Sequence, residues 1–512
     1  MCIRDSFYPV DYFNRGAIFD MNAFTNGRIS TVYPNAPAGT LFYGDAGVPR
    51  PFVHQSPWQF SPNLGFSYDV TGKGSTVVRG GFELIYDQVN FFNGQRVQAN
   101  PPYATTISNV QTATSGPLSL SAPWSKGAYT TSPFPQPNVP TPATALFYPQ
   151  STYYFLKQDL HPSYTEQYTL SMQHQLPHGW QAQVDYIGNH TLHDPIASPL
   201  NPAIYVPGVW GAAGTGCAGV VTSGFSGAAA GAVGTPCSTT ANQAQRYALT
   251  RINPAQGNQY GGGAVSAIIA DYGWSSYNGV IATLQHRISN SFSVLTNYTY
   301  SKCLNTQDAN GDVTTVGFPT RDYGPCGSDF RHVFNFVVVA RSKVKTLPRF
   351  ADAVLSDWEI SPLIHLTSGA PVNVTSGVDI SLTNTGQDRP SVIPGVNPYL
   401  RTAVRSAGTG RAFLNPAAFC STSCIAPGTY GNVSRNSLRG LPYYQTDAQI
   451  SRIFPIHEAI NLQFRLEGFN LLNHPYFAGP SSTSLTSSTF GYVTSTGGEG
   501  PRIFQGSFKV NF

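Results

Sequence analysis

The sequence predicts an all-β protein, an antiparallel transmembrane β-barrel. About eleven strands with long extracellular loops are predicted. Three observations predict this class. Apolar and polar residues alternate with a period of two in many segments, and the connections between these segments are alternately short and long. Only 11% of the residues are charged, against about 25% in typical soluble domains.

Each alternating segment carries apolar residues on one parity and polar residues on the other. The first carries Leu64, Phe66 and Tyr68 on one parity, and Asn63, Ser67 and Asp69 on the other. A strand that is apolar on one side only shows this pattern. The same reading predicts strands over residues 62–70, 76–86, 167–176, 180–186, 277–288, 291–302, 329–341, 357–368, 443–454, 460–472 and 503–512.

The connections support a membrane barrel rather than a soluble sandwich. Short turns ("TGKG", "PH", "SN", "PIHEA" and a longer one near 342–356) alternate with long segments at 87–164, 189–276, 303–328, 376–442 and 473–502. Outer-membrane barrels have short periplasmic turns and long extracellular loops. The physical reason for closure is that unpaired backbone groups in hydrocarbon cost several kcal/mol each. A secreted soluble β-sandwich enzyme is the rival fold.

The last strand ends on an aromatic residue. Phe504, Phe508, Val510 and Phe512 share one parity. A terminal aromatic residue with apolar residues at every second position before it resembles the segment that the outer-membrane assembly machinery recognises. We therefore expect these four residues to act as a membrane-insertion signal.

Several segments resemble one family. "FSPNLGFSYDVTGKGSTVVRGGFELIYDQ" (60–88), "FRLEGFNLLNHPYF" (464–477) and the C-terminal segment are similar to TonB-dependent outer-membrane receptors of the Oar-like type, which carry a carboxypeptidase-regulatory-like N-terminal domain. The resemblance implies energised uptake of a nutrient across the outer membrane of a Gram-negative bacterium. It also implies contacts with outer-membrane lipid, the barrel assembly machinery, the TonB complex and an unknown extracellular ligand. A passive porin-like channel or a surface adhesin is the alternative.

The resemblance covers only part of such a receptor. Barrels of this class have about 22 strands and a plugged lumen, whereas about eleven strands are predicted here. No signal peptide begins the sequence, and "MCIRDS" resembles translated non-native sequence. We therefore expect residues 1–61 to be a non-native leader followed by the remainder of an extracellular loop, and residues 62–512 to be the C-terminal portion of the barrel. The plug and TonB box would lie in a missing N-terminal part.

Six of the seven cysteines fall in pairs within predicted extracellular loops. Because the cell exterior is oxidising, we expect loop disulfides. The pairs are Cys217 with Cys237, Cys303 with Cys326, and Cys420 with Cys424. The seventh, Cys2, lies in the leader. "CSTSC" is also compatible with half of a zinc site, but no second Cys/His pair lies near it.

Catalytic and metal sites are weakly indicated. Two segments are weak metal candidates, "NHTLHD" and "DANGDV"; their residues are His190, His193, Asp194, Asp308, Asn310 and Asp312. The second segment lacks the sixth-position Gly and twelfth-position Glu of a calcium loop. No Gly-x-Ser-x-Gly motif is present and no cofactor is expected, so we predict a protein that is not an enzyme.

Binding is the expected role of the loops. No Lys/Arg cluster marks a nucleic-acid surface, and the net charge is only +4. Ligand contacts are expected from the long loops and the inward parity of the upper barrel, for example at "YYQ" (443–445).

Overall fold

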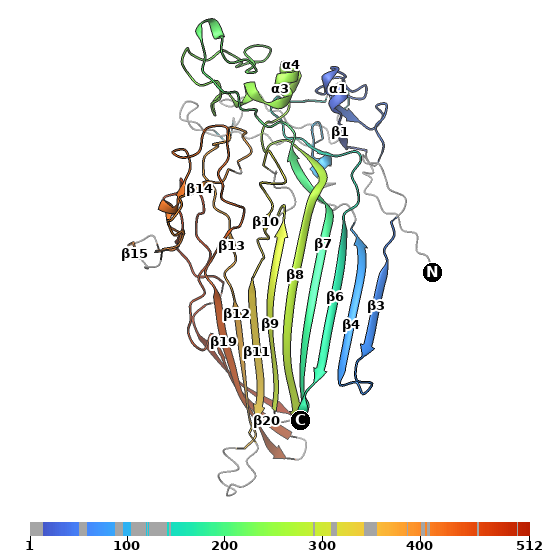
Figure 1. Cartoon of the computed structure of the whole chain (residues 1–512), viewed down its shortest axis with the longest axis vertical. Coiled ribbons are helices and arrows are strands. Elements are labelled where there is room, and N and C mark those ends of the chain that lie inside the picture. Colours follow the sequence, from blue (N-terminus) through green and yellow to red (C-terminus); the bar gives the residue numbers. More distant parts are fainter. Residues whose placement is uncertain are drawn as a thin grey trace.

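The computed structural model consists mainly of one large antiparallel sheet (Figure 1). It describes residues 14–50, 59–87, 96–103, 119, 121, 141–142, 145–289, 292–308, 315–342, 356–386, 388–400, 405–406, 410–457, 460–498 and 500–512. The main path of the sheet runs β22-β20-β19-β12-β11-β9-β8-β7-β6-β4-β3. The eleven expected strands are therefore confirmed, and each pairs with its neighbours along the chain.

The bounds of these strands follow the predicted segments closely, except that two of them are much longer. β7 and β8 extend far beyond the predicted 180–186 and 277–288. The strands are β3 (Asn63–Asp69), β4 (Thr76–Tyr86), β6 (Tyr164–Gln175), β7 (Trp180–Pro199), β8 (Ala267–Ser289), β9 (Phe292–Asn305), β11 (His332–Arg341), β12 (Trp358–Thr367), β19 (Tyr443–His457), β20 (Ile460–Phe469) and β22 (Ile503–Asn511).

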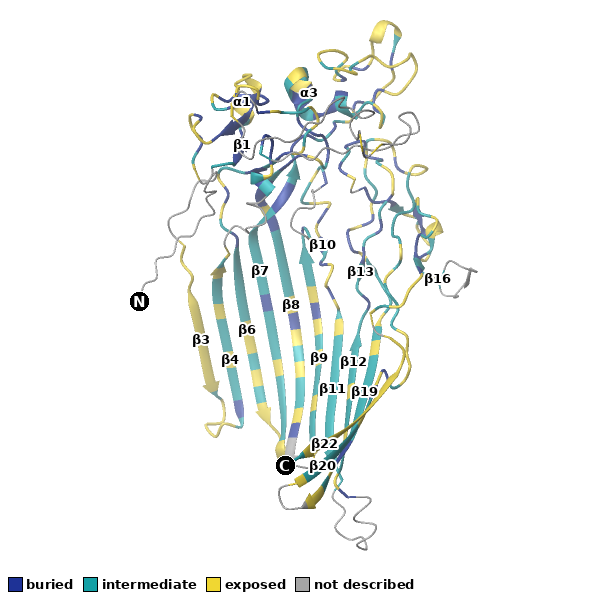
Figure 2. Cartoon of the chain, turned by 180° about the vertical axis from the view of Figure 1, so that it is seen from behind, coloured by how far each residue is buried: buried dark blue, intermediate teal, exposed yellow. Residues whose placement is uncertain are grey.

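The register places apolar residues opposite one another across the sheet. Phe464 pairs with Phe508, and Phe336 pairs with Ile364. The apolar face is the face that carries these residues, and most of its apolar side chains are partly or fully exposed, for example 73% for Phe508. Within the described residues no second layer covers this face (Figure 2), so a soluble sandwich is excluded. An apolar face of this kind is suited to contact with the hydrocarbon of a lipid bilayer.

The opposite, polar face carries amides and hydroxyls. One row of paired positions crosses seven strands, and every strand contributes a polar side chain. Its members are Gln173, Gln183, Thr283, Asn297, Asn335, His365 and Gln445. This alternation is what a wet barrel interior requires.

The short turns lie together at one end of the sheet, and the long connections lie at the other (Figure 1). In "TGKG", Asp69 accepts hydrogen bonds from the backbone N–H groups of Thr71 and Gly74, at 3.1 and 2.7 Å. Gly72 and Gly74 adopt φ values of 64° and 73°, which favour glycine. The predicted segregation of loop length is thus confirmed. We refer to the end with long connections as the extracellular end.

The long connections pack into small cores at the extracellular end (Figure 2). One core joins residues 14–50 to later loops through Phe24, Phe42, Tyr153, Phe155 and Tyr260. The short elements of the long connections before β8 are β1 (Ala17–Phe19), α1 (Met21–Thr25), β2 (Thr40–Phe42), β5 (Tyr154–Leu156), η2 (Ala212–Gly214), η3 (Gln243–Arg246), α3 (Ala248–Ile252) and α4 (Pro254–Gly257).

A second core, around Val374, Leu414 and Phe490, holds the loops that follow β12 and β20. No helix in the described part of the chain is long and apolar enough to cross a membrane. The remaining short elements are η1 (Pro177–Gly179), β10 (Gly324–Pro325), β13 (Pro371–Val372), β14 (Ser391–Val392), β15 (Arg405–Ser406), β16 (Gly410–Ala412), η4 (Pro416–Ala418), β17 (Phe419–Cys420), β18 (Leu438–Arg439) and β21 (Tyr492–Val493).

Candidate functional site

A cavity of about 570 Å³ lies on the polar face where β11, β12 and β19 reach the extracellular end. Its strand-borne residues have the inward parity, and three loop segments (368–372, 440–441 and 476–479) complete it. The lining residues are Phe330, Val333, His365, Thr367, Ser368, Ala370, Pro371, Val372, Gly440, Leu441, Tyr443, Gln445, Tyr476, Phe477, Ala478 and Gly479. We call this cavity the rim pocket.

Aromatic rings and an amide form one side of the rim pocket. The Tyr443 ring meets that of Tyr476 edge to face, with centroids 4.8 Å apart, and lies 5.6 Å from the His365 ring. The Tyr443 hydroxyl donates to the Gln445 amide oxygen. Tyr444 has the opposite parity and is 45% exposed on the apolar face. Of "YYQ", therefore, Tyr443 and Gln445 line the pocket and Tyr444 does not.

Below the rim pocket, polar side chains are linked across neighbouring strands. The Asn335 amide donates to Asn297 Oδ1 at 2.8 Å, and Asn335 Oδ1 lies 2.5 Å from His365 Nδ1. Gln445 donates to Asp447 at 2.9 Å. Because these groups are held by one another, the pocket floor presents fixed hydrogen-bonding groups to the interior.

The side of the pocket near Phe330 is anchored by a buried carboxylate. Asp329, whose side chain is fully buried, accepts hydrogen bonds from Arg331 at 2.9 Å, from Arg439, and from the backbone N–H of Cys303 at 2.7 Å. Burial raises the pKa of Asp329, but the hydrogen bonds, led by that of Arg439, outweigh it and hold this pKa below its ordinary value. The loop that contains β18 is thereby fixed to the start of β11.

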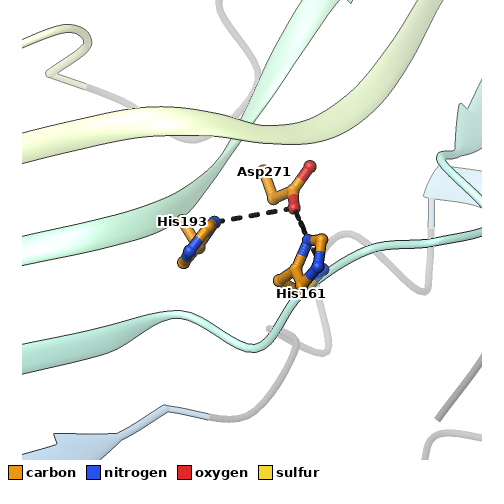
Figure 3. A group of neighbouring side chains, drawn as sticks. All are labelled: His161, His193 and Asp271. Carbon is orange, nitrogen blue, oxygen red and sulfur yellow. Dashed lines mark hydrogen bonds and ion pairs between the residues drawn. The ribbon is translucent and has the colours of Figure 1, made fainter. Parts of the chain in front are cut away.

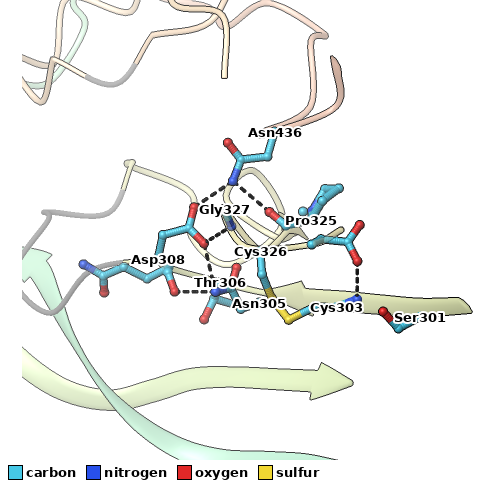
Figure 4. The surroundings of a disulfide bond; sticks show 12 residues. Ser301, Cys303, Asn305, Thr306, Asp308, Pro325, Cys326, Gly327 and Asn436 are labelled. Atoms are coloured by element: carbon cyan, nitrogen blue, oxygen red, sulfur yellow. Dashed lines mark hydrogen bonds between the residues drawn. A yellow bond between two sulfur atoms is a disulfide. The ribbon is translucent and has the colours of Figure 1, made fainter. Parts of the chain in front are cut away.

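A second ionic contact, with Arg435, involves the predicted calcium candidate Asp308. Figure 4 shows Asp308 with its neighbours Asn436 and Gly327. The Asp308 carboxylate lies 2.5 Å from Arg435 Nη1 and accepts hydrogen bonds from Asn436 at 2.7 Å and the Gly327 backbone at 2.6 Å. The Asp308 carboxylate thus links its own loop, which contains Gly327, to the loop that contains Arg435 and Asn436. The other two candidates, Asn310 and Asp312, lie outside the described residues.

The structure joins the six loop cysteines in the pairs that their positions suggested. Cys217 is bonded to Cys237, Cys303 to Cys326 and Cys420 to Cys424, with Cα–Cα distances of 5.3, 5.4 and 6.0 Å. The second of these lies close to Asp308 (Figure 4). Cys2 and the rest of residues 1–13 lie outside the described part of the chain.

The predicted histidine candidates do not come together. His190 faces Glu166, with 4.0 Å between Nδ1 and Oε2. Asp194 is in a separate environment, where burial and then the nearby Asp87 raise its pKa. His193 instead lies near His161 and Asp271 (Figure 3). These two partners of His193 could not be identified from the sequence, because they come from separate segments and no local spacing marks them.

Three residues of the expected insertion signal, Phe504, Phe508 and Val510, lie on the apolar face of β22, the strand that ends the sheet path. The fourth, Phe512, follows the last residue of that strand. Phe504, Phe508, Val510 and Phe512 are 58%, 73%, 53% and 98% exposed.

Comparison with known proteins supports an outer-membrane assignment. The family described as outer membrane beta barrel domain matches residues 6–505. No curated protein sequence matches. Solved structures that resemble the chain include the outer membrane transporter YddB from Escherichia coli, at 8% identity and a TM-score of 0.42, over 87% of this chain and 39% of that one.

Two further solved structures are similar to the chain. A mutant of the ferric enterobactin receptor PfeA from Pseudomonas aeruginosa has 13% identity and a TM-score of 0.37, over 88% of this chain and 40% of that one. The iron transporter FrpB from Neisseria meningitidis has 7% identity and a TM-score of 0.37, over 88% and 39%. The chain therefore spans about two fifths of the length of these three proteins.

Proposed function

Because this chain belongs to the outer membrane beta-barrel domain family and is located in the outer membrane of Gram-negative bacteria, we propose that it is the C-terminal barrel portion of a TonB-dependent receptor of the Oar-like type. The proposed activity is energised uptake of a nutrient that first binds at the extracellular end. Binding and transport, rather than catalysis, are the proposed chemistry.

The observation that carries this proposal is the rim pocket above a polar interior face. Rings of Tyr443 and Tyr476 stand over amide and imidazole groups of Gln445 and His365. Flat rings beside amides suit ligands with both apolar surfaces and hydroxyl or carbonyl groups, because each part finds a matching partner. A solute held there lies at the mouth of the water-lined side of the sheet.

We further propose that strands outside this sequence close the barrel. Among the described residues, β3 pairs only with β4 and β22 pairs only with β20, so each has one unpaired edge. In hydrocarbon such edges are costly, because their N–H and C=O groups find no water. The division into a leader and loop remnant (1–61) and a barrel portion (62–512) belongs to this proposal.

The proposed partners follow from the same assignment. The assembly machinery would recognise the last strand through Phe504, Phe508, Val510 and Phe512, whose side chains are exposed. TonB would act through a plug and TonB box in the N-terminal part of the receptor. Lipid would cover the apolar face, and the ligand would contact the loops at the extracellular end.

The DNA upstream of this reading frame provides the decisive test. A plug and a TonB box upstream are expected. A signal peptide that leads directly into alternating strands would instead support a passive channel or an adhesin. As a second test, the whole gene product is inserted into planar bilayers in KCl. A receptor is expected to conduct little in the absence of TonB, whereas steady, large conductance would contradict the proposal.

A further inference from the structure

Three side chains from separate segments meet at the extracellular end of β7 and β8, outside the rim pocket (Figure 3). We call them the His161 cluster: His161 from the segment before β6, His193 from β7 and Asp271 from β8. One ligand atom from each lies within 4.8 Å of the others. Asp271 Oδ2 lies 2.5 Å from His161 Nδ1 and 3.6 Å from His193 Nδ1.

The backbone of β7 departs from regular strand geometry at this point. His193 adopts φ of 58°, in the left-handed region that residues other than glycine rarely occupy. The register with β8 shifts between Leu192 and Asp194, and again between Asp194 and Ile196. Bulges of this kind re-aim a side chain. Here the imidazole of His193 is directed to the same carboxylate oxygen as His161 (Figure 3).

The cluster combines a buried anion with accessible imidazoles. The side chain of Asp271 is 3% exposed, whereas those of His161 and His193 are 62% and 37% exposed. The other carboxylate oxygen, Oδ1, is 3.0 Å from Lys157 Nζ. Lys157 therefore holds one oxygen and leaves the second one to the two histidines. The Lys157 ammonium also lies 3.5 Å from Asp159, which is an alternative partner for it.

We propose that the His161 cluster is a binding site for a divalent transition-metal ion, with Zn²⁺ as the ion to test first. Two imidazole nitrogens and one carboxylate oxygen are a donor set that suits Zn²⁺, and solvent would fill the remaining position on the exposed side. The ion would replace the contact between His161 Nδ1 and Asp271 Oδ2, whereas the backbone N–H of His161 would keep its 3.1 Å hydrogen bond to this oxygen. Because donor atoms on a tetrahedral zinc ion lie about 3.3 Å apart, the exposed imidazole of His161 would rotate to move its Nδ1 away from Asp271 Oδ2, which is now 2.5 Å from it. The bound ion would tether three segments at the extracellular end. This site does not depend on the identity of the transported ligand.

The test is a titration of the metal-stripped protein with ZnCl₂ by isothermal titration calorimetry. The protein is the whole gene product, extracted from outer membranes in detergent. The six cysteines that follow residue 13 are in disulfides and cannot offer thiolates. One saturable site is expected. Loss of a single ligand, by His161→Gln or His193→Asn, is expected to weaken binding by about tenfold or more. Asn is chosen at 193 because it tolerates positive φ.

Two further variants make the result specific. His190→Gln removes a histidine of β7 outside the cluster and is expected to leave the affinity unchanged. Lys157→Met removes the cation that competes for Asp271, and Zn²⁺ is then expected to bind more tightly. Heat-modifiable gel migration verifies that each variant is folded.

Three outcomes would overturn the proposal. They are no saturable binding by the parent protein, equal affinity in the His161→Gln, His193→Asn and His190→Gln variants, and weaker binding after Lys157→Met. The last result would mean that Lys157 is needed to hold Asp271 in place, so that the cluster is an ion-pair network and not a metal site.

Discussion

Phe464 and Phe508 lie directly opposite each other on neighbouring strands, with ring centroids 5.2 Å apart, and both belong to the apolar face. The residue before Phe508 on β22, Ser507, pairs with Arg465 on the polar face. Two adjacent positions of one strand are therefore expected to meet different solvents.

This difference predicts that a lysine lowers the stability of the protein much more at position 508 than at position 507. Phe508→Lys is expected to destabilise the folded protein by about 2–4 kcal/mol if position 508 lies near the bilayer midplane, and by less near an interface, because it places a charge in hydrocarbon. Ser507→Lys, the matched control, is expected to change the free energy of unfolding by less than about 0.5 kcal/mol. Urea unfolding of the whole gene product in lipid vesicles measures both. Equal losses would mean that the two faces do not meet different solvents.

The rim pocket predicts a difference between two adjacent tyrosines. Tyr443→Ala removes a pocket ring, whereas Tyr444→Ala removes a ring from the apolar face. In the native bacterium, the growth or uptake defect caused by deleting the gene is expected to reappear with Tyr443→Ala. Tyr444→Ala is expected to retain function at a similar surface level. If both variants support wild-type growth, the pocket is not the binding site.

Asp271 predicts an acid-sensitive contact. Burial raises the pKa of this carboxyl, but hydrogen bonds from Lys157 and His161 outweigh it and bring the pKa to about 2. Because the folded pKa is below the ordinary value of 3.8, the contact contributes its full stability above pH 3.8 and loses it as the pH falls toward 2. Asp271 lies beyond the roughly ten residues of β8 that a bilayer needs, on the extracellular side.

The measurement is pepsin cleavage of the segment between β5 and β6, at pH 4 and at pH 2, on the protein in lipid vesicles. Resistance is expected at the higher pH and cleavage at the lower. The Asp271→Asn variant is expected to be cleaved at both. Unchanged resistance of the parent protein down to pH 2 would show that the carboxylate does not hold this segment.

The disulfides predict loop stabilities that depend on their spacing. In the chain-entropy description, closing the 23-residue separation between Cys303 and Cys326 contributes about 3 kcal/mol. The four-residue separation of Cys420 and Cys424 contributes about 2 kcal/mol. Replacing the first pair by serines is therefore expected to increase trypsin cleavage near Arg321 and Arg331 on intact cells more than replacing the second pair does. An equal increase for both pairs would argue against this account.

The sheet could be predicted from the sequence because each strand shows its own alternation of apolar and polar residues. Each strand alternates around positions such as Phe66 or Phe508, so parity alone assigned both faces. The extensions of β7 and β8 could not be predicted, because bulges near Asp194 interrupt the alternation on which the reading depended.

The structure of the loops could be predicted less well from the sequence, for a different reason. Two-residue strands such as β13 and β14 exist through pairing with distant loop segments, which leaves no periodicity. The His161 cluster is a similar case: His161 and Asp271 are 110 residues apart and meet only because the chain returns beside β7. The inward parity of Tyr443, by contrast, could be read directly from the alternation of its strand.

The extracellular end is built differently on its two sides. On one side β7 and β8 continue as paired strands of 20 and 23 residues, whereas β11 and β12 stop after 10 each and loops take over. A continuous ladder opens only when many backbone hydrogen bonds break together, but loops held by a few side chains open locally. The rim pocket lies on the loop side. Any movement that admits or releases a solute is therefore expected to be hinged there, with the β7–β8 side serving as the stationary frame.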